Sequence, residues 1–443
     1  MFNGGGKLPL FIREKTRTIR TDNDALKFDV AEPPNWSYSP GDTIIGNLVR
    51  KEGIVSPEAI VKVGLIGRAV TQIIDKGNQG SARHYTGAYS YLGLEQDLLF
   101  KGPLHLPKGV QPGGVVAGPL SWPFCVKIPT EPVDNRNRGL TKEISFLPLD
   151  KDHPVRHVLP GTFSSSQNRY GRESNSFIEY YLSAQLRYWY GSELKTVTAT
   201  WPITLRHPLE SGVDLIGQLT ETSTQRLIQS QRLVPGMRHR GLSFKQKMQK
   251  SFGSSKVPEF CFKFIITYPK VIQFGNPEPI PIIFEIEPVP EKTSEEIRDV
   301  SQRIEITSVK MSLSSWTYIC CPGNFSNTDL HSDTQKSSHD LGLGKALETL
   351  ESPLEIYTAD GKADKPINLG NMFQLTLHRS GLKSGSKNLS LTGHSRCPVL
   401  YPDFVTYCIR HKNSLVWEIS LHVSGEKHSF TMTTRDLKLI SSD

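Results

Sequence analysis

Apolar and polar residues alternate along most of this chain, and a period of two is the pattern of half-buried β-strands. Runs with this alternation lie at 177–186, 199–205, 262–268, 280–286 and 415–423. In 177–186 one face carries Ile178, Tyr180, Leu182, Ala184 and Leu186, and the other carries Glu179, Ser183 and Gln185. The sequence therefore predicts an all-β fold built from antiparallel sheets.

Two of these runs have local irregularities. The runs 262–268 and 280–286 are joined by a turn sequence at 275–277 and resemble a hairpin, but Pro281 lies inside the second run. Because proline donates no ladder hydrogen bond, it predicts an edge strand or a bulge there. In 304–313 the apolar phase moves from even positions, such as Ile306, to odd ones, such as Val309, which predicts a β-bulge.

The strand pattern breaks twice, and the breaks divide the chain. A chain of 443 residues is long for one domain. The first break, from about 206 to 258, predicts an N-terminal β-sandwich over 1–208 and a hinge with a basic connection over 209–258. A C-terminal β-sandwich follows over 259–443, and the second break predicts a long polar loop over 322–366.

Positive charge is concentrated in one segment. Residues 222–258 hold eight Lys and Arg and no Asp or Glu, while the whole chain has 52 basic and 44 acidic residues. The rest of the chain is therefore balanced, and the net charge of +8 comes from this segment. Such a concentration predicts an anionic partner that meets one surface.

Part of the basic segment has the pattern of a short amphipathic helix. Ser243 is a capping residue, Gly253 a terminating one, and the apolar residues between them share a face. The segment is a candidate contact with an anionic membrane. Packing of this helix on a sandwich and disorder remain alternatives, whereas nucleic acid is not expected because stacking aromatics are absent. The candidate residues are Arg238, Arg240, Phe244, Lys245, Lys247, Met248, Lys250 and Phe252.

A second basic row lies near the N-terminus. Arg13, Lys15 and Arg17 occupy alternate positions, so in a regular strand their side chains share one face. Such a row is a candidate contact for acidic or phosphorylated tails. A solvated edge strand protected by charge is the alternative.

Motifs of catalysis and metal binding are absent from the sequence. It holds no H-E-x-x-H, paired CxxC or GxSxG pattern, and its 13 histidines are scattered. We therefore expect no enzyme activity, no cofactor and no metal. The six cysteines are widely spaced and are expected to pack as small hydrophobes in a reducing compartment. No apolar run approaches the roughly 18 to 20 residues that cross a bilayer, which predicts a cytoplasmic protein.

Three motifs in order resemble the arrestin family, in its α-arrestin branch. They are YSPGDTIIGNLVRKEG at 38–53, SWPFCVKIPTEP at 121–132, and LPGTF at 159–163 followed by FIEYYLSAQL at 177–186. Gly46 in the first motif is at a position that favours a bulge or a close backbone approach. Residues 262–288 are similar to the opening hairpin of the arrestin C-domain.

The resemblance implies two antiparallel immunoglobulin-like β-sandwiches joined by a hinge, with a short basic helix or disordered insertion between them. It also implies an adaptor that binds cytosolic tails of membrane proteins, is recruited peripherally to the plasma membrane or endosomes, and acts in endocytosis, sorting or ubiquitylation. A ubiquitin ligase is an implied partner, but no Pro-Pro-x-Tyr peptide occurs, so direct WW docking is not expected. The alternatives are an arrestin-fold coat or retromer-like sorting subunit, and a β-sandwich small-ligand carrier or enzyme.

Overall fold

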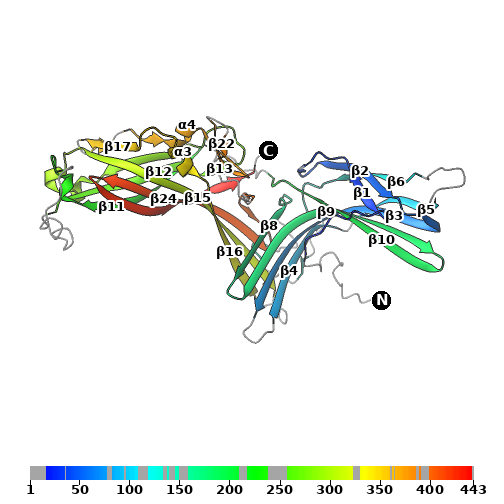
Figure 1. The fold of residues 1–443 in the computed structure, drawn as a ribbon. Coiled ribbons are helices and arrows are strands. Elements are labelled where there is room, and N and C mark those ends of the chain that lie inside the picture. The colour runs from blue at the N-terminus through cyan, green and yellow to red at the C-terminus, as the bar shows by residue number, and fades with distance from the viewer. Residues whose placement is uncertain are drawn as a thin grey trace. The chain divides into compact units, whose positions relative to one another are not determined.

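The computed structural model consists mainly of β-strands with a few short helices, and the predicted all-β fold is confirmed (Figure 1). Among the strand pairs whose register is described, one short pair is parallel and the others are antiparallel. The residues that the structure describes are 16–34, 36–76, 82–93, 96–107, 118–132, 137–138, 145–148, 158–208, 217–237, 257–322, 330–359, 362–363, 365–385, 389–390 and 399–441.

The chain forms two compact units. The first unit comprises 1–208, 317–335 and 404–411, and the second comprises 209–316, 336–403 and 412–443. Strands that begin in one unit and end in the other account for the two additional segments of the first unit, as the bounds of β15 (Gln302–Pro322) show.

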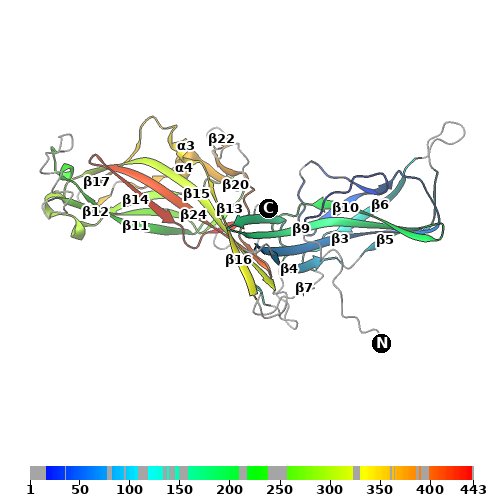
Figure 2. The same cartoon turned by 60° about the horizontal axis from the view of Figure 1, so that its bottom comes forward.

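The first unit contains a three-stranded and a seven-stranded sheet, and Figure 2 shows the long strands β3 and β9 side by side. Ile44 and Leu48 from the smaller sheet and Leu182 and Leu186 from the larger one are fully buried. The smaller sheet has the order β1 (Lys27–Val30), β2 (Thr43–Arg50), β6 (Leu120–Lys127). The larger sheet has the order β10 (Glu193–Ile203), β9 (Arg172–Tyr190), β3 (Ile54–Lys76), β4 (Ala82–Leu92), β7 (Asn137–Arg138), with β5 (Asp97–Leu106) paired to β3 and β8 (Phe163–Arg169) to β9.

The second unit has two main sheets. One has the order β11 (Leu219–Gln229), β12 (Glu259–Pro269), β14 (Ile283–Pro288), β19 (Ile367–Asn368). The other has the order β18 (Lys362–Ala363), β17 (Leu354–Ala359), β15, β24 (Ile409–Val423), with β16 (Leu330–Asp340) paired to β15 and β25 (Glu426–Thr433) to β24. The strand β23 (Phe404–Val405), which pairs with β24, belongs to the first unit.

Short elements complete the second unit. They are β13 (Val271–Gln273), β26 (Lys438–Ile440), β20 (Leu375–His378), β21 (Gly381–Ser384), β22 (Leu389–Ser390), the helices α3 (Leu343–Leu347) and α4 (Leu369–Phe373), and the 3₁₀ turns η2 (Gln231–Leu233), η3 (Pro290–Lys292) and η4 (Glu295–Ile297).

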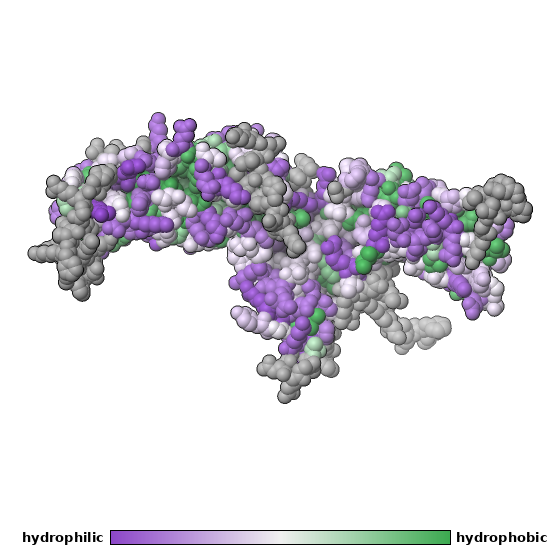
Figure 3. Space-filling model, viewed as in Figure 1, coloured by the Kyte–Doolittle hydropathy of each residue, from purple (hydrophilic) through white to green (hydrophobic). Residues whose placement is uncertain are grey.

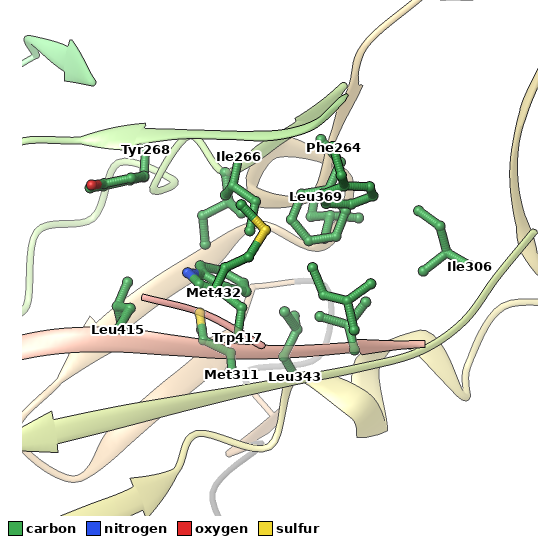
Figure 4. Close-up of a cluster of buried hydrophobic side chains, with 14 of the residues drawn as sticks. Phe264, Ile266, Tyr268, Ile306, Met311, Leu343, Leu369, Leu415, Trp417 and Met432 are labelled. Carbon is green, nitrogen blue, oxygen red and sulfur yellow. The ribbon is translucent and has the colours of Figure 1, made fainter. Parts of the chain in front are cut away.

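The core of the second unit lies between its two main sheets. Figure 4 shows Phe264 and Ile266 of β12 above Met311 of β15 and Trp417 of β24. Trp417 is fully buried, and its ring meets that of Phe284 edge to face at 5.9 Å between centroids. The alternate apolar residues of 262–268 and 415–423 thus form the inward faces of two strands that pack against each other.

Several expectations about strands are confirmed. The run 177–186 lies within β9, and β12 and β14 pair antiparallel. The expectation for Pro281 was wrong: Pro281 lies before β14, which begins at Ile283 and pairs with both β12 and β19, so it marks neither an edge strand nor a bulge. In β15, Thr307 and Ser308 are both exposed between the buried Ile306 and Val309, so the change of phase is present in the structure, while the β-bulge stays a prediction.

Two expected irregular regions contain strands. Residues 219–229, placed in the hinge and basic connection 209–258, form β11 and pair with β12 along its whole length. Much of the expected loop 322–366 forms β16, α3 and β17. Strands β11 and β16 are rich in polar residues, and pairing with a neighbouring strand satisfies their backbone groups although their own side chains form no broad apolar face.

Candidate binding face of the first unit

A stretch of chain near the N-terminus is fixed along strand β10. The amide of Thr21 donates to the carbonyl oxygen of Thr200 at 2.9 Å, and the Thr200 amide donates to the Thr21 hydroxyl at 3.1 Å. The Thr200 hydroxyl donates in turn to the carbonyl oxygen of Ile19 at 2.6 Å. Residues 19–21 therefore continue the hydrogen bonding of the larger sheet beyond β10.

A buried ion pair holds the preceding residues. Arg68 of β3 and Glu179 of β9 are directly opposite one another, and their side chains are 0% and 5% exposed. The guanidinium donates to one oxygen of Glu179 from Nε at 2.9 Å and from Nη2 at 2.7 Å. Taking two charges out of water is costly unless they are paired and further hydrogen-bonded.

The further hydrogen bonds come from the N-terminal stretch. Arg68 Nη2 donates to the carbonyl oxygen of Thr16 at 2.9 Å. Thr18 donates to Glu179 twice, from its amide at 2.9 Å and from its hydroxyl at 3.0 Å. Residues 16–18 thus supply hydrogen-bond partners for the buried ion pair, and the same hydrogen bonds hold these residues against the larger sheet.

Arg17 lies between these two anchoring residues, and its side chain is exposed. It is the member of the expected basic row that the structure describes, since Arg13 and Lys15 lie outside the described residues. Arg20 behaves differently, because its guanidinium stacks on the Trp201 ring at 3.6 Å from the centroid. The anchored stretch therefore presents the Arg17 cation while Arg20 is held against the sheet.

The same face of the sheet continues outward as a polar, cationic stripe. Beyond Glu179 this face of β9 carries the buried Tyr181 and then Ser183, Gln185 and Arg187, because side chains repeat every two residues. Their partners on β10 are Thr200, Thr198 and Thr196, and Lys62 of β3 lies opposite Gln185. Over these described positions beyond Glu179 the face carries no carboxylate.

We call this surface the basic face, defined by Arg17, Lys62, Gln185, Arg187, Thr196 and Thr198. Within the described part of the chain, no carboxylate lies within salt-bridge distance of Arg187 or Lys62. Strands rise about 3.4 Å per residue, so the polar positions 183 to 187 of β9 span roughly 14 Å. A face of this length and charge fits an extended anionic chain.

Sequence reasoning found part of this face. The alternation in 177–186 placed Glu179, Ser183 and Gln185 together, and the structure confirms their common face. It did not find Arg68, Lys62 or Arg187, which come to the site from the register of β3 with β9. Neither Lys62 nor Arg187 has a basic residue two positions away in its own strand, so no local pattern marks either of them.

The candidate membrane residues Arg238, Arg240, Phe244, Lys245, Lys247, Met248, Lys250 and Phe252 lie outside the described residues. Two other cations of the segment 222–258 are described, and both contact the second unit. The guanidinium of Arg226 lies 4.5 Å from the Phe430 ring centroid, and Arg232 donates to the carbonyl oxygen of Gly425 at 3.5 Å.

The cysteines are structural where they are described. Cys261, Cys320, Cys321 and Cys408 are buried free thiols, whereas Cys125 is exposed. Burial raises the pKa of the Cys320 thiol to about 12 and that of Cys321 to about 11. Both therefore stay protonated at neutral pH and are poor nucleophiles.

The described residues contain no group of His, Cys, Asp or Glu arranged to hold a metal ion. None of their helices is long and apolar enough to cross a membrane. No family model and no curated protein matches the chain.

Proposed function

We propose that this protein is a non-catalytic, arrestin-like adaptor that binds acidic or phosphorylated cytosolic tails of membrane proteins and links them to endocytosis, sorting or ubiquitylation machinery. The ordered motifs and the two β-rich units support the arrestin-like part of this proposal. The observation that carries the binding part is the basic face, where Arg17 is held on an anchored stretch and Lys62 and Arg187 lack carboxylate partners among the described residues.

A tail bound in extended form along the basic face would place acidic or phosphorylated side chains against Lys62 and Arg187. Charge-assisted hydrogen bonds from Lys and Arg to phosphate are about twice as strong as neutral ones. The hydroxyls of Thr196 and Thr198 add neutral donors beside the cations. Affinity should therefore depend on the negative charge of the tail and fall as salt is raised.

The test is fluorescence anisotropy with a labelled twelve-residue peptide bearing three phosphoserines, compared with the same peptide unphosphorylated. The variant Lys62→Glu/Arg187→Glu should bind the phosphorylated peptide at least about tenfold more weakly than the native protein. Lys263→Glu/Lys310→Glu, which changes the net charge equally at two exposed lysines of the second unit, is the control. Equal weakening by both variants would show only a general charge effect and would reject the basic face.

Recruitment to membranes is a separate part of the proposal and rests on the basic segment 222–258. Lys245→Glu/Lys247→Glu/Lys250→Glu should lower co-sedimentation with vesicles that contain anionic phospholipid, and should not change co-sedimentation with neutral vesicles. If the native protein and this variant sediment equally with anionic vesicles, the segment does not contact the membrane.

A further inference from the structure

The second unit has a hollow beside the slip of phase in β15. Strand β17 pairs with β15 only as far as Leu354 opposite Ile306. Further along β15, the amide of Leu341 donates to the carbonyl oxygen of Met311 at 2.8 Å, just after β16 ends at Asp340. The chain between Leu341 and Leu354 leaves the sheet to form α3 and a turn, so neither β16 nor β17 extends along Thr307 to Lys310.

This interruption leaves a cavity of about 310 Å³. Its floor is apolar, because Ile306, Val309 and Leu354 are buried there and Leu347 and Leu350 are half-buried. Figure 4 places Ile306 at one end of the core cluster, so the floor is the outer end of a packed core and not a separate void.

The rim of the hollow is acidic. Glu305, Glu348 and Glu351 line it, and none of its lining residues is Lys or Arg. Glu348 and Glu351 are exposed, and among the residues that the structure describes no cation lies within salt-bridge distance of either. Glu305 has Arg303 at 3.8 Å, but Arg303 also pairs with Glu355 and stands outside the hollow.

Hydropathy on the surface agrees with this description. In Figure 3, hydrophobic colour lies between hydrophilic groups over the region where Figure 1 draws α3. An apolar floor beside the carboxylates of Glu348 and Glu351 disfavours nucleic acid and anionic lipid, since both would bring negative charge to negative charge. It favours a ligand that combines an apolar side chain with positive charges on either side.

We propose that this hollow is a docking site for a short basic segment of a partner protein, in which a Leu- or Met-sized side chain enters the hollow and flanking Lys or Arg residues meet Glu348 and Glu351. The interrupted ladder supplies a place beside Thr307 and Ser308 where such a segment lies extended along β15. This site lies in the second unit, is acidic and takes a basic partner, whereas the basic face lies in the first unit and takes an acidic partner. The proposal for the hollow therefore does not depend on the proposed function.

The probe for this site is a labelled eight-residue peptide of alternating Lys and Leu, with a matched peptide that carries Glu in place of Lys. The native full-length protein should bind the Lys peptide, with affinity that falls as salt is raised, and should not bind the Glu peptide. Glu348→Gln/Glu351→Gln should weaken binding about tenfold or more while leaving the thermal unfolding midpoint unchanged, because both side chains are exposed.

The matched control is Glu291→Gln/Glu296→Gln, which removes two exposed carboxylates elsewhere on the same unit. This variant should bind the Lys peptide as the native protein does. A second variant, Leu350→Asn, tests the floor and should weaken binding without any change of net charge.

Three results would overturn the proposal. They are equal weakening by the two Glu-to-Gln variants, equal binding of the Lys and Glu peptides, and self-association in sedimentation that Glu348→Gln/Glu351→Gln abolishes, which would assign the hollow to a second copy of the chain. Binding of the phosphoserine peptide should be unchanged in Glu348→Gln/Glu351→Gln, which keeps this test separate from that of the basic face.

Discussion

Glu179 is a carboxylate held inside the first unit by donors from two distant parts of the chain. Arg68 donates from Nε and Nη2, and Thr18 donates from its amide and its hydroxyl. Such a pair adds little net stability relative to apolar residues, but removal of one partner leaves the other charge buried and uncompensated. The cost of a single substitution should therefore be large.

Glu179→Gln should lower the free energy of unfolding by about 3 to 5 kcal/mol, because Arg68 remains buried without its counter-charge. It should also loosen residues 16–18, whose hydrogen bonds end on this carboxylate. Urea unfolding followed by circular dichroism measures the first effect, and hydrogen exchange of the Thr18 amide the second. Glu287→Gln, at the exposed ion pair with Lys263, should leave unfolding almost unchanged. A similar effect from both variants would contradict this account.

Asp403 introduces a pH dependence in the second unit. Burial raises the pKa of its carboxyl to about 7, although the Asn413 side-chain amide donates to it at 2.6 Å. In the unfolded chain the carboxyl has a pKa near 4, so between about pH 4 and 7 the folded state binds more protons. Stability from this group is thus present at low pH and is lost as pH rises through 7.

The measurement is the unfolding free energy of the native protein and of Asp403→Asn at pH 5 and pH 8. Relative to the variant, the native protein should lose stability over this range, by at most about 1.4 kcal/mol per pH unit within the titration window. Asp299→Asn, at an exposed position, controls for the loss of one charge. A constant difference between the native protein and Asp403→Asn would show that Asp403 does not titrate differently on folding.

At the residue scale, the alternation of apolar and polar residues predicted on which face of a strand a side chain lies, but not whether that side chain is buried. It placed Glu179 on the outward face, where a charged residue is expected to be solvated, whereas the structure buries it. The reason is Arg68, which is 111 residues away in sequence and becomes its neighbour only through the register of β3 with β9. A pairing of that range leaves no local signal in either strand.

At the scale of elements, Gly46 fixes how β1 approaches β2. A Cβ atom at this position would lie 2.5 Å from the carbonyl oxygen of Asp29 and 2.9 Å from the Phe124 ring. The close backbone approach expected at Gly46 is therefore present. The aromatic pair behind it, Phe28 and Phe124, meets edge to face at 5.5 Å between centroids.

Gly46→Ala should displace β1 or Phe124 and destabilise the first unit by about 1 to 3 kcal/mol, the usual range for overpacking. Hydrogen exchange should rise in Lys27–Val30, the strand that loses its contact. Gly118→Ala is the matched control, because a Cβ there meets nothing within 4 Å. Unchanged exchange in β1 would mean that the strand accommodates the methyl group and that the approach is not constraining.

The strands that were not predicted from the sequence, β11 and β16, share a polar composition. Strand β16 reads LHSDTQKSSHD and has no apolar face, so alternation gave no reason to predict it. It is held by pairing with β15 and by Gln335, whose side chain donates to the carbonyl oxygen of Ser174 at 3.0 Å. Strand β11 is likewise held by the buried β12. Strands that depend on a neighbour can be predicted only when that neighbour is known.

At the scale of the whole molecule, alternation locates strands without saying which sheet each one joins. The expected C-terminal sandwich, 259–443, included residues 317–335 and 404–411, whereas contacts assign both segments to the first unit. Within that unit the Thr71 hydroxyl donates to the carbonyl oxygen of Cys320 at 2.8 Å. The rings of Tyr89 and Tyr407 stack at 4.3 Å between centroids. The first unit is thus completed by residues from the second half of the sequence.

Residues 1–208 expressed alone should therefore be much less stable than the same residues in the full chain, because Tyr89 and Thr71 lose the groups that cover them. In the full chain, Tyr407→Ala should reproduce part of this effect and cost roughly 3 kcal/mol, as removal of a buried aromatic ring does. Hydrogen exchange in β4 is the readout, and Val405→Ala, at an exposed neighbour, is the control. Native-like protection of β4 in 1–208 alone would show that the first unit folds without these segments and that their packing contributes little.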